Sequence, residues 1–188
     1  IAYYNKFNYE KALENYKISY EINKYIKDTV ETIKVLDNIA YLHKKIQQNE
    51  KALEYYFELQ EYCEAIENQS GLYKNYNHIA SIYWSSGNYE KAKLYFARTL
   101  KISKSLDDDN AITRAYSNLG MVYHENNQYD SSIVFHNNAL NLAKVNQNLS
   151  AQAIILNNLA LVYKTKGNYE KALEISKQAY SLYEKKDM

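Results

Sequence analysis

Few side chains in this sequence have the types and spacing that catalysis or metal binding requires. The stretch HENNQ begins at His124 like a zinc-binding HExxH helix, but Gln128 stands where the second histidine would be. The other histidines show no close ligand spacing, and neither a glycine-rich phosphate loop nor a Ser/His/Asp motif is present. The single Cys63 can form no internal disulfide, so we expect a packed small side chain. The sequence therefore predicts no catalytic residues, no metal site and no cofactor.

Stretches related to NYEKA recur at a fixed interval along the chain. The tyrosine position of this motif recurs every 40 residues, at Tyr9, Asn49, Tyr89, Tyr129 and Tyr169. A fixed period between about 20 and 50 residues is the signature of a stacked repeat array. We therefore interpret the 188 residues as repeats whose core grows with their number.

The composition favours helices joined by short polar turns. The chain has no proline and only four glycines, which nearly excludes an all-β fold with many tight turns. Its 23 basic and 22 acidic residues offer no phosphate track, so the 22 tyrosines do not indicate nucleic-acid binding. No apolar run approaches the length of about 20 residues that spans a bilayer. We expect an all-α fold that binds no nucleic acid and inserts no part of this stretch into a membrane.

Each 40-residue unit contains two segments with apolar side chains at helical spacing. In the last unit, Ile155, Leu159 and Val162 share one stripe of the first segment, and NYEKALEISKQAYSLYEKK forms the second. Between the two segments, Gly167 can stop the first helix and Asn168 can cap the second. Caps are also expected near the starts of first helices at Ser70, Asp109 and Ser150. Every unit is therefore predicted to be a helical hairpin.

The residue pattern inside the hairpins resembles one family of helical repeats. Two stretches carry the resemblance to the tetratricopeptide repeat: Tyr116-x2-Leu119-Gly120-x2-Tyr123 for its first helix and Ala92-x3-Phe96 for its second. Variants of these motifs begin at Ala12, Ala52, Tyr76 and Leu156. HEAT-like repeats have a period of about 40 to 47 residues and tetratricopeptide repeats one of about 34, so the residue pattern decides between them. A small residue where two helices cross lets them approach closely, which fits the motif.

Three features depart from the usual tetratricopeptide pattern. No proline ends the second helices, and each unit is about six residues longer than the usual repeat. Ser132 and His136 replace the alanine and the aromatic residue of the second-helix motif, so we expect a looser contact there. Arrays with this longer spacing are similar to those found in bacterial signalling proteins and in partner-binding scaffolds.

The resemblance implies a right-handed superhelical solenoid of antiparallel helical hairpins, with Ala80, Gly120 and Ala160 buried at the crossings. We expect a single array over residues 1–188, composed of a partial repeat and four whole ones: 1–28, 29–68, 69–108, 109–148 and 149–188. The opening IAYYNKF looks like the end of a first helix, so nine complete helices should follow this remnant. Because solenoids need polar capping units, we expect a fragment of a longer protein.

In this family, partners bind a concave face built mainly from the first helices, where Lys, Arg and Asn grip a peptide. The matching positions here form a basic row, a mostly amide row and two further asparagines: Lys34, Lys74 and Arg114; Asn38, His78, Asn118 and Asn158; and Asn77 and Asn157. Arginine can clamp a carboxylate, and an asparagine amide both donates to and accepts from an extended backbone. One alternative is that the amides bond neighbouring helices and the basic residues are merely solvated.

These expectations favour a non-catalytic protein-protein interaction module that binds an extended, acidic peptide or partner segment in its concave groove. The alternative is a sensory or regulatory region of a bacterial signal-transduction protein, with the kinase or DNA-binding domain outside these residues. Self-association through the uncapped ends also stays open, and enzyme activity would need chemistry from another domain.

Overall fold

The computed structural model describes the backbone of residues 2–186 and the side chains of residues 8–184. Within this range the chain forms nine α-helices and no strand. The helices are α1 (Ala2–Tyr25), α2 (Thr29–Lys45), α3 (Asn49–Ala65), α4 (Gln69–Ser85), α5 (Tyr89–Ser105), α6 (Asp109–Glu125), α7 (Tyr129–Val145), α8 (Leu149–Thr165) and α9 (Tyr169–Lys186). The predicted all-α fold class and the predicted number of helices are confirmed.

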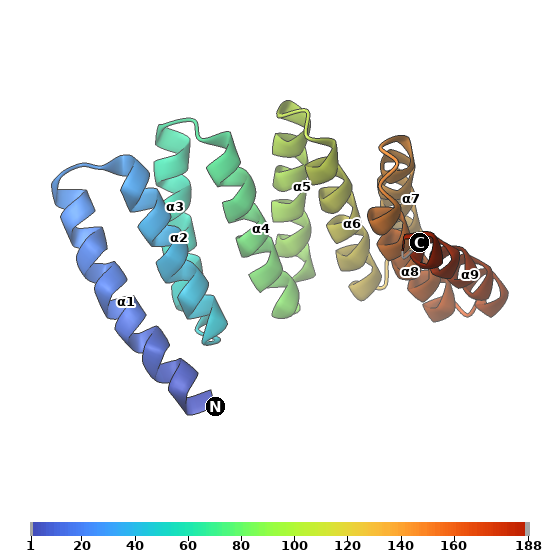
Figure 1. Ribbon diagram of the computed structural model, residues 1–188, viewed down its shortest axis with the longest axis horizontal. Coiled ribbons are helices and arrows are strands. Elements are labelled where there is room, and N and C mark those ends of the chain that lie inside the picture. The colour runs from blue at the N-terminus through green and yellow to red at the C-terminus, as the bar shows by residue number, and fades with distance from the viewer. Residues whose placement is uncertain (1, 187–188) are drawn as a thin grey trace. The chain divides into compact units, whose positions relative to one another are not determined.

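The helices group into two compact units. The first unit, Ile1–Ser86, contains α1 to α4, and the second, Gly87–Met188, contains α5 to α9. Inside each unit every helix packs against the next one along the chain, antiparallel to it (Figure 1). In addition, α2 contacts α4 and α6 contacts α8. The first helices of successive hairpins therefore lie side by side within each unit.

The core of each unit lies between the first and second helices of its hairpins. In the first unit the fully buried side chains include Leu36, Ile39, Tyr56 and Ile79. In the second unit a buried cluster joins α7, α8 and α9, and it contains Ala139, Leu140, Ala143, Ile155, Leu156, Leu159, Ala160, Ile175 and Ala179. These are the apolar positions that recur at helical spacing in the sequence.

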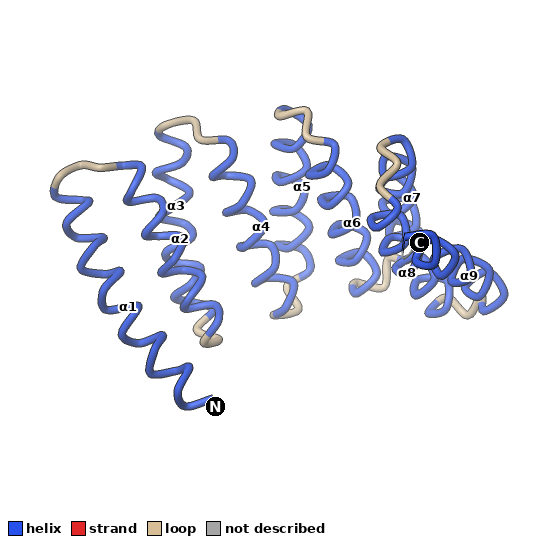
Figure 2. The backbone as a smooth tube through the Cα atoms, viewed as in Figure 1, coloured by secondary structure: helices blue, strands red, loops and turns tan. Residues whose placement is uncertain are grey.

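One turn geometry joins all the helices. Helices α2 to α8 have 17 residues each, and every connection is a three-residue turn (Figure 2). The middle residue of every turn has a positive φ: Lys27, Gln47, Glu67, Gly87, Asp107, Asn127, Gln147 and Gly167. After α3, the N–H groups of Glu67 and Asn68 donate to the carbonyls of Glu64 and Cys63, which is the Schellman pattern. The backbone therefore repeats every 20 residues, twice as often as the sequence motif.

The residue after the left-handed position caps the next helix in six of the eight turns. The side-chain oxygens that accept a backbone N–H three residues on belong to Asp28, Asn68, Asn88, Asp108, Asn148 and Asn168. The predictions that Asn168 caps α9 and that Gly167 ends α8 are confirmed. The predicted caps Ser70, Asp109 and Ser150 are wrong, because each of these residues already lies inside its helix.

Helix α1 corrects another expectation. It runs without a break from Ala2 to Tyr25, so the predicted remnant of a separate helix before Tyr9 does not exist. Neither proline nor glycine interrupts this stretch, so the intrahelical hydrogen bonds continue through it.

The small residues at the helix crossings are buried, as predicted for Ala80, Gly120 and Ala160. Gly120 lies directly against the ring of His136, where an added Cβ would come within 2.7 Å of three imidazole atoms. The Ser132 hydroxyl donates to the Gly120 carbonyl at 2.8 Å. The contact that we expected to be looser is therefore tight, because the missing side chain of glycine makes room for the ring.

His136 is fully buried but has no hydrogen bond for either ring nitrogen within the described residues. Burial, with a smaller contribution from the nearby His124, lowers the pKa of this imidazole to about 4. At neutral pH the ring is therefore uncharged. It packs as an aromatic side chain at the position that Tyr56 and Phe96 occupy in earlier second helices.

Candidate functional site

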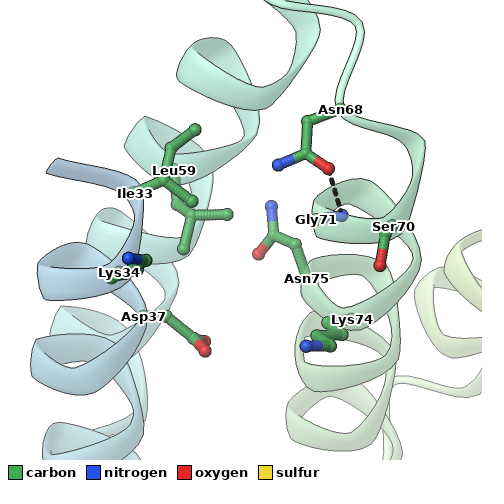
Figure 3. Close-up of a pocket in the computed structure, with 9 residues that line it drawn as sticks. All are labelled: Ile33, Lys34, Asp37, Leu59, Asn68, Ser70, Gly71, Lys74 and Asn75. Carbon is green, nitrogen blue, oxygen red and sulfur yellow. Dashed lines mark hydrogen bonds between the residues drawn. The ribbon is translucent and has the colours of Figure 1, made fainter. Parts of the chain in front are cut away.

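The first unit contains a pocket between helices α2, α3 and α4, with a volume of about 190 Å³. Helix α2 contributes Ile33, Lys34 and Asp37, and α3 contributes Leu59. The remaining wall comes from Asn68, Ser70 and Gly71 around the start of α4 and from Lys74 and Asn75 one turn further on (Figure 3). Two of the predicted site residues, Lys34 and Lys74, are thus brought to one pocket. Their side chains reach it because α2 and α4 lie side by side.

Charged groups surround the mouth of this pocket. The Lys34 side chain is 61% exposed, and its Nζ lies 2.5 Å from Glu31 Oε1 on the same helix. Lys74 is also exposed, whereas Asp37 is partly buried. The Asn68 side chain caps α4 by accepting the Gly71 N–H at 2.9 Å. Positive groups therefore sit on both helices, with carboxylates interspersed on α2.

Asn75 forms the inner wall of the pocket. Its side chain is 1% exposed, and Nδ2 donates to the Tyr56 carbonyl of α3 at 2.8 Å. No hydrogen bond reaches the buried Oδ1 from any residue whose side chain the structure describes. Buried polar oxygens nearly always have a partner, so this one marks an incomplete arrangement.

His78 lies next to the same face, one turn after Lys74 on α4. Its ring stacks on Tyr56 with centroids 5.2 Å apart, and Nε2 is 4.0 Å from Asp37 Oδ1. Burial lowers the pKa of this imidazole, while the Asp37 carboxylate partly opposes that effect. His78 is therefore a neutral, mostly packed ring at neutral pH. The placement of His78 among the binding residues stays a prediction.

The predicted site asparagines fall into two groups. Asn38 is exposed on α2, and Asn118 is partly exposed on α6. In the others, Nδ2 already approaches a neighbour: Asn77 donates to the Tyr73 carbonyl at 2.9 Å, Asn157 lies 3.4 Å from the Tyr183 hydroxyl and Asn158 lies 3.5 Å from Ser117 Oγ. The two contacts to other helices are long, so these amides stay adaptable.

The second unit carries the remaining basic site residue. Arg114 is exposed on α6, four residues before Asn118 and on the same face of the helix. In α8 the matching position is Ile154, which is exposed as well. The basic row of this unit therefore ends at α6, as the sequence indicates.

Sequence reasoning missed Asn75. At the matching buried position the other three first helices have Val35, Ala115 and Ile155, so Asn75 is the one polar residue in an apolar column. This contrast between the repeats could have identified Asn75 from the sequence. The motif positions drew attention to exposed residues instead.

The histidines and the cysteine form no metal site in the part of the chain that the structure describes. No three His, Cys or acidic side chains come together there in a way that would hold an ion. His124 Nε2 lies 3.0 Å from Thr165 Oγ1, which makes it a structural contact between α6 and α8. Cys63 is buried, as predicted, and burial raises the pKa of its thiol to about 11. Over residues 2–186, none of the helices is both long and apolar enough to cross a membrane.

Hairpins of equal length, with small residues at their crossings, define an α-helical repeat protein. The family model described as Tetratricopeptide repeat matches residues 72–145 and 112–185, which together span more than half of the chain. The chain belongs to the tetratricopeptide repeat family, and the resemblance seen in the sequence is confirmed.

Several solved structures share this fold. BtubC from P. vanneervenii is 18% identical with a TM-score of 0.74, over 99% of this chain and 85% of that one. The apo form of RapI is 20% identical with a TM-score of 0.86, over 97% of this chain and 51% of RapI. A Rap protein complexed with Competence and Sporulation Factor is 19% identical with a TM-score of 0.72, over 96% and 52%. Among curated proteins, none matches the sequence.

Proposed function

We propose that this chain is a non-catalytic interaction module that binds an extended peptide or partner segment along the exposed face of its first helices. The observation that carries the proposal is the placement of Lys34 and Lys74, 40 residues apart, at one pocket between α2 and α4 (Figure 3). Each exposed ammonium group offers three donors and a full positive charge. On the second unit, Arg114 and Asn118 supply the same kinds of group.

The partner that this chemistry favours is acidic. Exposed lysines attract carboxylates at a cost in desolvation that is small compared with that of buried groups. Glu31 already neutralises part of Lys34, so an incoming carboxylate competes with an ion pair that is itself weak. Such contacts are screened over about 10 Å at 0.1 M ionic strength, so affinity should fall as salt is raised.

The comparisons support a binding role without identifying the partner. A Rap protein with the same fold has been solved in complex with Competence and Sporulation Factor, so an array of this architecture is able to hold a partner. Within the described residues, neither a metal-binding cluster nor a reactive thiol suggests a reaction. The proposed role is therefore recognition.

The proposal is tested by selecting an acidic peptide from a displayed library and measuring its affinity by calorimetry. Arg114→Ala with Asn118→Ala should weaken binding by on the order of 2–4 kcal/mol, since one charge-assisted contact and one backbone clamp are lost. Lys101→Ala serves as the control, because Lys101 is exposed on α5, which is the second helix of its hairpin and lies outside the proposed binding face. If the double variant binds the peptide as well as the parent chain does, the second unit takes no part in recognition.

Self-association is a second candidate, based on one observation. Helix α9 exposes Leu173 (58%) and Tyr180 (64%). In α7 the residue equivalent to Tyr180 is Leu140, which α8 covers and which is only 7% exposed. We propose that this face of α9 packs against a second copy of the chain. Sedimentation velocity should then show a concentration-dependent dimer that Tyr180→Lys abolishes. A parent chain that stays monomeric at high concentration contradicts this proposal.

A further inference from the structure

We propose that the pocket between α2, α3 and α4 receives one side chain of the bound partner, and that this side chain ends in a neutral N–H or O–H donor. A carboxamide or a hydroxyl has this property. The inference rests on the proposed function, because it specifies what the bound segment places in the pocket. Asn75 at the inner wall carries the argument, together with Lys34, Asp37 and Lys74 at the mouth (Figure 3).

The first step is the buried acceptor of Asn75. Its Nδ2 donates to the Tyr56 carbonyl, which fixes the orientation of the amide. The other polar atom of the amide, Oδ1, takes no part in this hydrogen bond. This oxygen has no partner among the described side chains and backbone. Figure 3 shows the amide reaching from α4 into the space that faces α2. An oxygen that lacks a donor is satisfied by a bound group that brings one.

The second step concerns charge. Lys34 and Lys74 contribute two positive charges near the pocket, and Asp37 and Glu31, the ion-pair partner of Lys34, contribute two negative ones. A fully charged group entering the pocket would lose hydration without meeting a net opposite charge. A carboxylate or phosphate would also place an acceptor oxygen against Oδ1 of Asn75. A neutral donor avoids both costs.

The third step concerns size and the remaining wall. A cavity of about 150 Å³ is enough to hold a benzene molecule, so a pocket of about 190 Å³ takes one side chain but not a nucleotide. Ile33 and Leu59 offer apolar surface for the methylene groups of such a side chain. Acidic residues next to it in the partner would then meet Lys34 and Lys74 at the mouth.

The inference is tested with two small probes of the same shape, propionamide and propionate. In ¹H–¹⁵N NMR spectra, propionamide should shift the backbone signal of Gly71 and the side-chain amide signal of Asn75, with affinity in the millimolar range expected for so small a ligand. Propionate, which has only acceptors, should bind at least tenfold more weakly. Equal binding of the two probes, or no binding by either, overturns the inference.

A matched variant isolates the role of the acceptor. Asn75→Val places in α4 the residue that α2 carries at the same position, Val35, so the helix packing has a precedent in this chain. The variant should lose propionamide binding, which is then read from the Gly71 signal. Asn75→Ala, for which Ala115 in α6 is the precedent, should do the same and covers the case in which the first variant folds poorly. Unchanged binding in the folded variants would show that Oδ1 does not hold the probe and that the inference is wrong.

Failure of the inference is distinguishable from failure of the proposed function. With a selected acidic peptide, replacing a carboxamide or hydroxyl residue by leucine or aspartate should weaken binding about tenfold, and Asn75→Val should remove that preference. If the peptide binds without this preference, the proposed function stands and the inference fails. If propionamide binds as expected and no peptide is found, the pocket chemistry is confirmed and the proposed function fails.

Discussion

Replacing His136 by phenylalanine should make the fold much less sensitive to acid. The ring of His136 is fully buried against Gly120, and neither nitrogen has a hydrogen-bond partner in the part of the chain that the structure describes. The uncharged ring is therefore compatible with the folded state, and the imidazolium is not. Phenylalanine is a somewhat larger aromatic side chain that cannot be protonated. Phe96 and Tyr56 already fill the matching positions of α5 and α3.

The size of the effect follows from the two pKa values of His136. Burial, together with a smaller effect of His124, lowers the pKa from 6.5 in the unfolded chain to about 4 in the folded one. Below pH 6.5 the unfolded state binds a proton that the folded state does not, so the free energy of unfolding falls as pH falls through this window. At about 1.36 kcal/mol for each pH unit, the loss reaches about 3 kcal/mol near pH 4.

The assay is urea unfolding followed by far-UV circular dichroism, from neutral pH down to about pH 4. Near neutral pH, where neither ring is charged, the difference in free energy of unfolding between the parent chain and His136→Phe reports the packing of the larger phenyl ring. Relative to that difference, the variant should gain about 3 kcal/mol as the pH is lowered. His43 and His78 also have lowered pKa values and titrate in both proteins, so they cancel in the difference. A difference that stays constant with pH would refute the reasoning.

Three further substitutions, two of them with a companion variant, test the packing and the turns, each by the change in free energy of unfolding in urea. Gly120→Ala should cost about 1–3 kcal/mol, because the new Cβ meets the ring of His136, and combining it with His136→Ala should relieve part of that cost. Glu67→Gly should stabilise by about 0.5–1 kcal/mol, because Glu67 holds a φ of 53°, whereas Glu64→Gly inside α3 should destabilise. Ala160→Leu should cost about 1–3 kcal/mol, since Ala160 is buried at a crossing. A result of the opposite sign contradicts the contact in question.

The helical-hairpin architecture could be predicted because apolar spacing and small crossing residues repeat every 40 residues. The identical turns could not, because the left-handed position is filled by glycine only at Gly87 and Gly167 and by lysine, glutamine, glutamate, aspartate or asparagine elsewhere. The helix caps were predicted at the wrong residues because these turns could not be recognised in the sequence. In a Schellman turn one residue ends the first helix and caps the next, so Asn68 takes the role that we expected of Ser70.

The candidate site could be predicted only in part. The period places Lys34 and Lys74 at matching positions, and the structure brings both to one pocket. Contacts between helices cannot be read from the period alone, so the stacking of His78 on Tyr56 could not be predicted. Asn75 escaped notice because it lies in the apolar column, where its contact with the Tyr56 carbonyl depends on the approach of α3.

The central claim, that Lys34 and Lys74 hold an acidic partner segment, is tested most directly by one calorimetric titration series. A peptide selected on the parent chain is titrated into the parent and into the double variant Lys34→Ala with Lys74→Ala. The control is Lys51→Ala, which removes an exposed lysine from α3, the second helix of its hairpin. The account predicts at least tenfold weaker binding for the double variant, no change for Lys51→Ala, and affinity of the parent that falls with added salt. Equal affinity in all three proteins would contradict it.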